Sequence, residues 1–168
     1  SYLKSVVKLT ADLLRAGVST IVFGPSRNSV EIMLKYLRES LVGSVSEDAI
    51  MAYRGGYLPE TRRAVEHGLR DGSILGVVAT NALELGIDIG SVDCVVMIST
   101  PKGISRALQR IGRSGHSIHE ESHGVLVATN INDLMECIVC AEMTRREQLD
   151  EVRLLEAPLD VLAQLRER

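Results

Sequence analysis

The sequence predicts an α/β protein with a mainly parallel central sheet and helices on both of its faces. Short runs rich in Val and Ile recur along the chain, at 20–24, 50–54, 75–79, 93–98 and 124–129. Most of these runs are apolar at successive positions, as strands buried on both faces are. Segments with helical periodicity lie between them. Strands that alternate with helices form βαβ units, which place parallel strands in one sheet.

Apolar stripes and terminal residues define the helical segments. The first helix ends at Gly17, and its stripe consists of Val6, Leu9, Leu13 and Leu14. The second is entered through the polar residues 26–29 and has its stripe at Val30, Met33, Leu34 and Leu37. The third begins at Pro59, a residue that favours the first turn of a helix, and continues through 60–70. Further helices are expected at 80–85, 105–113 and 132–145.

Length and composition limit the classes of protein that remain. The chain has 168 residues, of which 45% are hydrophobic and 24% charged, so it is expected to form a folded domain rather than a disordered one. Its net charge of −3 gives no general basic field, so any contact with nucleic acid has to be local. No apolar run is long enough to cross a membrane, and no membrane partner is expected. Three cysteines, an odd number, favour a reducing, cytoplasmic compartment over a disulfide scaffold.

A local basic block lies between Asp93 and Glu120, an interval without any carboxylate. Its cationic and titratable residues are Lys102, Arg106, Arg110, Arg113, His116 and His119. On a helix, Arg106, Gln109, Arg110 and Arg113 would share one face, opposite an apolar stripe of Ile104, Leu108 and Ile111. Glycines at 112 and 115 are expected to end this helix. A solvated basic face is the alternative, but the missing acids favour a site for an anion, most simply a phosphate.

The distinctive loops follow the predicted strands. Residues 24–27, 54–57, 80–81 and 101–103 are polar, glycine-rich or cationic, and each follows a different strand. Because the carboxyl ends of parallel strands meet at one edge of the sheet, we expect these loops to form a common binding edge.

Residues 79–90 form a second informative stretch. Thr80 or Asn81 is placed to cap a helix, where a hydroxyl and unpaired backbone N–H groups can hold a phosphate. Gly86 and Gly90 bracket Asp88, a carboxylate that can accept a hydrogen bond from a ribose hydroxyl. Taken alone, this stretch is better explained by a capped helix followed by a turn, with Asp88 as a turn residue.

Together these stretches resemble a known family. Residues 79–90 and 109–116 resemble motifs V and VI of superfamily 2 helicases, and 23–27 resembles motif IV. The chain is therefore similar, over nearly its whole length, to the second RecA-like domain of such enzymes, which implies a RecA-like three-layer sandwich. Three segments resemble the Lhr (large helicase-related) branch: residues 83–88, the Gly-His end of motif VI and residues 157–164. Residues 53–59 instead resemble RecQ-like and DUF1998-type relatives. We expect a helicase C-terminal RecA-like domain at 1–150 and, at 151–168, a helical tail or the start of a winged-helix domain.

The resemblance also implies roles for individual residues. Three match catalytic positions: Arg113 as the arginine finger, Arg110 as a second cation and Gln109 as a sensor of the γ-phosphate. Gly86, Asp88 and His116 match cofactor-binding positions, with His116 standing where many relatives have a second finger arginine. Positions that hold the sugar-phosphate backbone correspond to Ser26, Arg27, Arg54, Thr80 and Asn81. The implied cofactor is ATP with Mg²⁺, and because no G-x-x-x-x-G-K-[ST] loop is present, the ion is expected on a first RecA-like domain.

The functional hypothesis is the second motor domain of an ATP-dependent helicase or translocase, inactive as an isolated piece. Its partners would be the first RecA-like domain of the same chain and single-stranded or duplex nucleic acid, with DNA favoured over RNA. A noncatalytic RecA-like interaction module is the alternative. A complete Rossmann-type enzyme is disfavoured because no glycine fingerprint follows the first strand.

No metal site is expected. The residues His116, His119, His123, Glu120 and Glu121 are better explained by a solvated loop. Cys137 and Cys140 lie in a helical pattern without a second cysteine pair, which favours a half-buried thiol pair over zinc.

Overall fold

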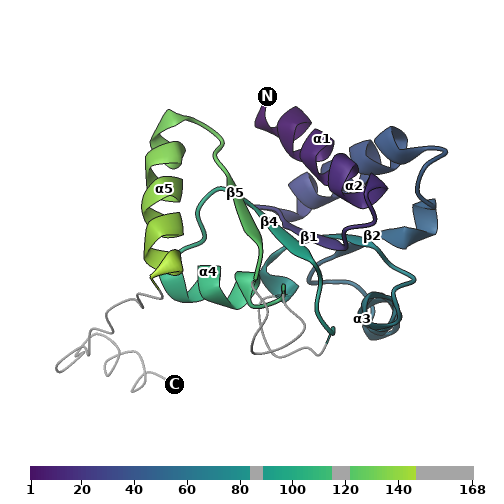
Figure 1. Cartoon of the computed structure of the whole chain (residues 1–168). Helices are drawn as coiled ribbons and strands as arrows, with labels where there is room; N and C mark the ends of the chain where they lie inside the picture. The colour runs from purple at the N-terminus through teal and green to yellow at the C-terminus, as the bar shows by residue number, and fades with distance from the viewer. Residues whose placement is uncertain (84–88, 115–121, 147–168) are drawn as a thin grey trace, which may run out of the picture.

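The computed structural model describes residues 1–83, 89–114 and 122–146, which contain a five-stranded sheet in the order β2-β3-β1-β4-β5 (Figure 1). The strands are β1 (Thr20–Phe23), β2 (Ile50–Tyr53), β3 (Gly76–Ala79), β4 (Cys94–Ile98) and β5 (Gly124–Val127). All neighbouring strands pair in parallel. The predicted fold class is therefore confirmed, and every predicted strand is present.

The described part of the chain also contains five α-helices and two short 3₁₀ helices, which precede, connect or follow the strands. They are α1 (Tyr2–Arg15), α2 (Arg27–Leu41), η1 (Glu47–Ala49), α3 (Pro59–Asp71), η2 (Asn81–Leu83), α4 (Ile104–Ile111) and α5 (Ile131–Arg145). The helix expected at 80–85 begins as the 3₁₀ helix η2, and residues 84 and 85 lie outside the described residues. The helix expected at 105–113 ends at Ile111, so the prediction that it includes Arg113 was wrong. No helix was predicted at the position of η1.

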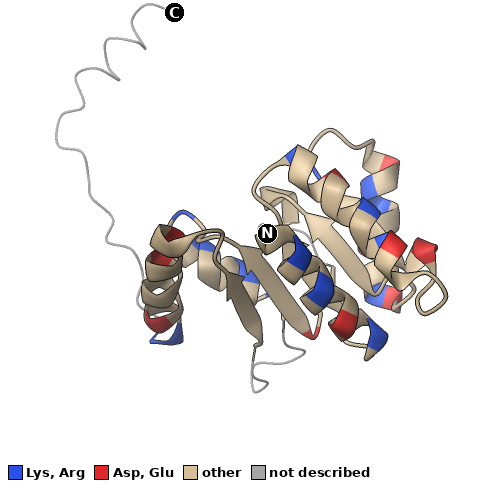
Figure 2. Ribbon diagram, turned by 90° about the horizontal axis from the view of Figure 1, so that it is seen from above, with Lys and Arg blue, Asp and Glu red and all other residues tan. Residues whose placement is uncertain are grey.

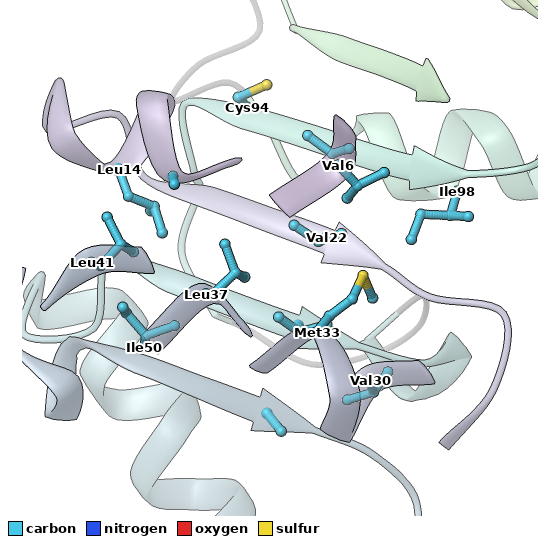
Figure 3. Packing of buried hydrophobic residues seen from close by; sticks show 14 residues of the cluster. Val6, Leu14, Val22, Val30, Met33, Leu37, Leu41, Ile50, Cys94 and Ile98 are labelled. Atoms are coloured by element: carbon cyan, nitrogen blue, oxygen red, sulfur yellow. The ribbon is translucent and has the colours of Figure 1, made fainter. Parts of the chain in front are cut away.

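The helices cover both faces of the sheet (Figure 1). On one face, α1 packs on β1 and α2 packs on β2 and β3, and their buried residues, which include Leu14 and Leu37, form one cluster with Val22 (Figure 3). On the other face, α3 packs through Val65 and Leu69 against a second buried cluster. Successive residues of a strand point to opposite faces, so the fully apolar strands supply side chains to both cores. This explains why the strands are continuous apolar runs rather than alternating ones.

The remaining two helices lie at the β4–β5 end of the sheet. Ile104 and Ala107 of α4 and Cys140 of α5 form a small buried cluster with Leu126 of β5 packed against it. Among the described helices, none combines the length and the apolar content that crossing a membrane requires.

Candidate functional site

The carboxyl ends of the strands meet at a cleft of about 450 Å³. Its lining comes from the loops after β1, β2, β3 and β4 and from α4, as the sequence predicted. The lining residues are Gly24, Pro25, Ser26, Arg27, Gly55, Thr80, Asn81, Ala82, Ile98, Ser99, Thr100, Pro101, Lys102, Arg106 and Arg110. None of these is an Asp or a Glu, whereas α1 carries both basic and acidic residues (Figure 2).

The structure brings together only some of the predicted site residues. Five of them line the cleft: Ser26, Arg27, Thr80, Asn81 and Arg110. Three do not: Arg54, Gln109 and Arg113. Gly86, Asp88 and His116 lie outside the described residues.

The start of α2 forms one wall. Ser26 is its N-cap: the Ser26 hydroxyl accepts a hydrogen bond from the Ser29 backbone N–H at 3.1 Å, and the Ser29 hydroxyl accepts one from the Ser26 N–H at 3.0 Å. Gly24 lets this end approach β1 closely, because a Cβ there would lie 3.0 Å from Met33 Cε. Arg27 follows the cap and is exposed. The wall therefore combines an arginine with the positive end of a helix dipole, both of which favour an anion.

The end of β3 contributes Thr80 and Asn81. The Thr80 backbone N–H donates to the Tyr53 carbonyl at 3.1 Å, which ties this point to the end of β2. Thr80 is largely buried at 8% exposure, whereas Asn81 is exposed.

The loop after β4 forms another wall of the cleft. Hydrogen bonds to Asp133 of α5 hold this loop in place. Ser99 has a positive φ of 64°, a strained value for a residue with a side chain. Its hydroxyl donates to the buried Asp133 carboxylate at 2.7 Å, and the Thr129 backbone N–H donates to the same carboxylate at 2.7 Å. Burial raises the pKa of Asp133, but hydrogen bonds from Thr129, Ser99 and Thr100 outweigh it, so the net direction is downward.

Sequence reasoning missed this part of the site. Ser99 and Thr100 line the cleft, yet the predicted loop began two positions later, at 101. The available signal was their position directly after a strand that the pattern placed in the sheet. Their partner Asp133 is more than thirty residues away in sequence, and no local pattern indicates that contact.

Helix α4 carries the basic wall. It begins after Gly103, whose φ of 95° favours glycine strongly, and it buries Ile104 and Ala107. Arg106 and Arg110 line the cleft, and the Arg110 guanidinium lies 4.7 Å from the centroid of the Phe23 ring. Lys102 and Arg106 form no salt bridge with the described part of the chain. These charges are therefore available to a ligand.

The basic helix ends at Gly112, as predicted, whereas Gly115 lies outside the described residues. Gly112 caps α4 in the right-handed conformation, with φ −61°, so a left-handed glycine does not end this helix. A Cβ at Gly112 would lie 3.1 Å from the Leu108 carbonyl oxygen, which indicates crowding instead. The Arg113 carbonyl accepts a hydrogen bond from the Val92 N–H at 2.9 Å, and Ser114 bridges to Val92. Arg113 is thus fixed to the sheet by its backbone, and its catalytic role stays a prediction.

Arg54 has an internal partner. Its Nε donates to Glu31 Oε1 at 2.7 Å, its guanidinium lies 4.5 Å from the centroid of the Tyr57 ring, and the Tyr57 hydroxyl donates to Glu31 at 3.0 Å. The hydrogen bond from Arg54 lowers the pKa of Glu31 despite partial burial. The neighbouring Gly55, rather than Arg54, lines the cleft.

The cysteine pair is part of the packing. Cys137 and Cys140 are 4% and 3% exposed on α5, and burial raises the pKa of the Cys137 thiol. Within residues 1–83, 89–114 and 122–146, no group of three or more His, Cys, Asp or Glu side chains is arranged to hold a metal ion. Of the histidine-rich segment, only His123 falls in that part of the chain.

Comparisons with known proteins agree with the geometry. Residues 3–118 match the model of the helicase conserved C-terminal domain. The chain is 40% identical over 153 residues to the ATP-dependent helicase Lhr-Core of Methanothermobacter thermautotrophicus, a match that covers 91% of this chain and 18% of that protein. The chain thus spans less than a fifth of the length of that relative.

Two solved structures share the fold with a TM-score of 0.83. One is the DUF1998 helicase MrfA bound to DNA and AMPPNP, 39% identical, over 96% of this chain and 23% of that one. The other is the Lhr helicase of Mycobacterium smegmatis bound to ssDNA and AMP-PNP, 38% identical, over 96% of this chain and 21% of that one. The RecA-like fold is therefore confirmed, and so is the resemblance to Lhr-type helicases. The chain belongs to the helicase conserved C-terminal domain family.

Proposed function

We propose that this chain is the second motor domain of an ATP-dependent helicase or translocase and that its cleft holds the sugar-phosphate backbone of a nucleic-acid strand. One observation carries the proposal. In a chain of net charge −3, the described residues that line the cleft include the cations Arg27, Lys102, Arg106 and Arg110 and no carboxylate. A groove lined in this way favours a polyanion, and contacts to phosphate carry affinity without reading sequence.

The walls of the cleft match what a backbone offers. The start of α2, the hydroxyl of Thr80 and the amide of Asn81 supply hydrogen-bond donors beside the four cations. Single-stranded DNA is the favoured ligand, because the MrfA and Lhr structures with the same fold contain DNA and ssDNA. Arg54 is the weakest of the proposed strand contacts, since Glu31 already holds it.

The ATP side of the proposal depends on the resemblance. Arg113 would act as the arginine finger and Gln109 as the γ-phosphate sensor, with Gly86, Asp88 and His116 also facing the nucleotide. ATP is the cofactor because the relatives are ATP-dependent helicases and the two solved structures contain AMP-PNP, an ATP analogue. Mg²⁺ would be held mainly by a first RecA-like domain, so the isolated chain should not hydrolyse ATP. Arg110 lines the cleft three positions before Arg113 and would connect the strand contacts to the nucleotide.

Fluorescence anisotropy with a labelled single-stranded oligonucleotide tests the strand site on this chain directly. The double variant Lys102→Ala, Arg106→Ala should bind the oligonucleotide at least about tenfold more weakly at low salt. Its log–log salt slope should fall by about 0.7 for each lost phosphate contact. Arg63→Ala is the matched control, because Arg63 is exposed on α3 and does not line the cleft. Equal losses in the double variant and the control would refute a specific strand cleft.

A further inference from the structure

The large apolar side chains of helix α5 are exposed and do not face the core of the domain. Its buried residues are Asp133, Cys137 and Cys140, which are small or polar. Its exposed residues include five large hydrophobics: Ile131 (72%), Leu134 (42%), Met135 (62%), Ile138 (55%) and Val139 (55%). By contrast, α1 and α2 bury residues such as Leu14 and Leu37. Burial of the domain's own core therefore does not explain the sequence of α5.

The five residues form one continuous stripe. They occupy positions i, i+3, i+4, i+7 and i+8 of the helix, the spacing of a face that contacts another structural element. The stripe continues into a groove of about 340 Å³ between α5 and the loop that leads into α4. Pro101, Ile104, Met135 and Val139 contribute to its lining. Exposed apolar patches of this kind mark interaction surfaces.

We propose that residues 147–168 of this same chain dock on this apolar face of α5. The segment follows directly from Arg146, the C-cap of α5. Its sequence contains eight Leu and Val residues: Leu149, Val152, Leu154, Leu155, Leu159, Val161, Leu162 and Leu165. Pro158 divides the segment, and apolar residues three positions apart lie on each side of it: Val152 and Leu155 before the proline, and Leu159 and Leu162 after it.

The length of the segment and its attachment favour it over a second copy of the chain. α5 has 15 residues and is thus about 22 Å long. The 22 residues from 147 to 168 reach up to about 70 Å when extended, so they can return along the whole stripe. A segment joined by a short connection also has an effective concentration of the order of millimolar, well above that of a second molecule in dilute solution.

Photo-crosslinking in the full chain tests the occupant. A p-benzoylphenylalanine at Ile138 should crosslink to residues within 147–168 of the same molecule, with a yield that does not change with protein concentration. The same group at Val42 is the control, because Val42 is 81% exposed and lies at the end of α2. Products between two molecules that grow with concentration would identify a second copy and overturn the proposal. So would the absence of any product within 147–168.

Hydrogen exchange provides a second measurement. Ile138→Glu places a charge in the middle of the exposed stripe without altering a buried residue. It should accelerate amide exchange in 147–168 by about tenfold or more while leaving exchange in the sheet unchanged. Val42→Glu should leave both unchanged. Equal exchange of 147–168 in the wild type and in Ile138→Glu would show that this segment does not cover α5.

Discussion

The loop after β2 and the loop after β4 both carry arginine or lysine at the same edge of the sheet, but the charges are arranged differently. Arg54 is held by Glu31 and stacked on Tyr57. Lys102 and Arg106 face the cleft without a carboxylate partner among the described residues. The first arrangement satisfies a charge within the domain, and the second leaves charge for a ligand. A cation at a binding edge is therefore not by itself a binding residue.

The largest difference is expected in ATP turnover, when Arg113 and Arg54 are replaced in turn. In a longer protein that joins this domain to a first RecA-like domain, Arg113→Ala should lower ATP turnover by a factor on the order of 10³ or more, because an arginine finger stabilises charge in the transition state. Arg54→Ala should change turnover far less. Steady-state ATPase rates and nucleotide affinity, measured separately for each variant, provide the check. Similar losses in both variants would contradict the proposed division of roles.

A smaller effect, on stability, is expected at Asp133, which accepts the hydrogen bonds that hold the loop after β4. Asp133→Asn should reduce the free energy of unfolding by about 1–3 kcal/mol, because one acceptor oxygen becomes an NH₂ group facing the Thr129 or Ser99 donors. The folded pKa of Asp133 lies below the ordinary value of 3.8. Its contribution is therefore fully present above that ordinary value and is lost as pH falls through the lowered folded pKa.

Denaturant unfolding across the acidic range measures this difference. The gap in stability between wild type and Asp133→Asn should be widest above about pH 4 and should narrow at lower pH. Asp12→Asn is the control, since Asp12 is 58% exposed on α1 and forms a surface pair with Arg15. A gap that does not change with pH would show that the Asp133 charge does not stabilise this loop.

The smallest effects, on stability and on oligonucleotide affinity, are expected for Arg54 in the loop after β2. Arg54→Ala is expected to change the free energy of unfolding only slightly, because its partner Glu31 is 44% exposed and water screens the pair. Glu31→Gln should release Arg54 and raise oligonucleotide affinity by less than about fivefold. Denaturant unfolding measures the change in stability, and anisotropy titrations at several salt concentrations measure the change in oligonucleotide affinity. An Arg54→Ala variant that loses as much affinity as Arg106→Ala would show that Arg54 leaves Glu31 for a phosphate.

The sequence was informative wherever short-range patterns determine structure. Apolar runs located the five strands to within two residues of their observed ends, and their carboxyl ends indicated the cleft that Arg27, Thr80 and Lys102 line. Contacts between distant side chains were not predictable. Glu31 and Arg54 are 23 positions apart, and no local pattern reveals that they pair. The exposure of Ile138 and Val139 was equally hidden, because helical periodicity does not show which apolar face turns inward.

The strand order also determines when this domain can fold during synthesis. The central strand β1 pairs with β3 and β4 and not with β2, which follows it in the chain. At a synthesis rate of roughly 5–20 residues per second, the ribosome needs roughly 3–10 s to proceed from Phe23 to Gly76. Until then, β1 and β2 are the only strands of this sheet that have been made, and they do not pair with each other. Residues 1–53 of the domain therefore keep apolar surface exposed for seconds, and such surface is what chaperones bind.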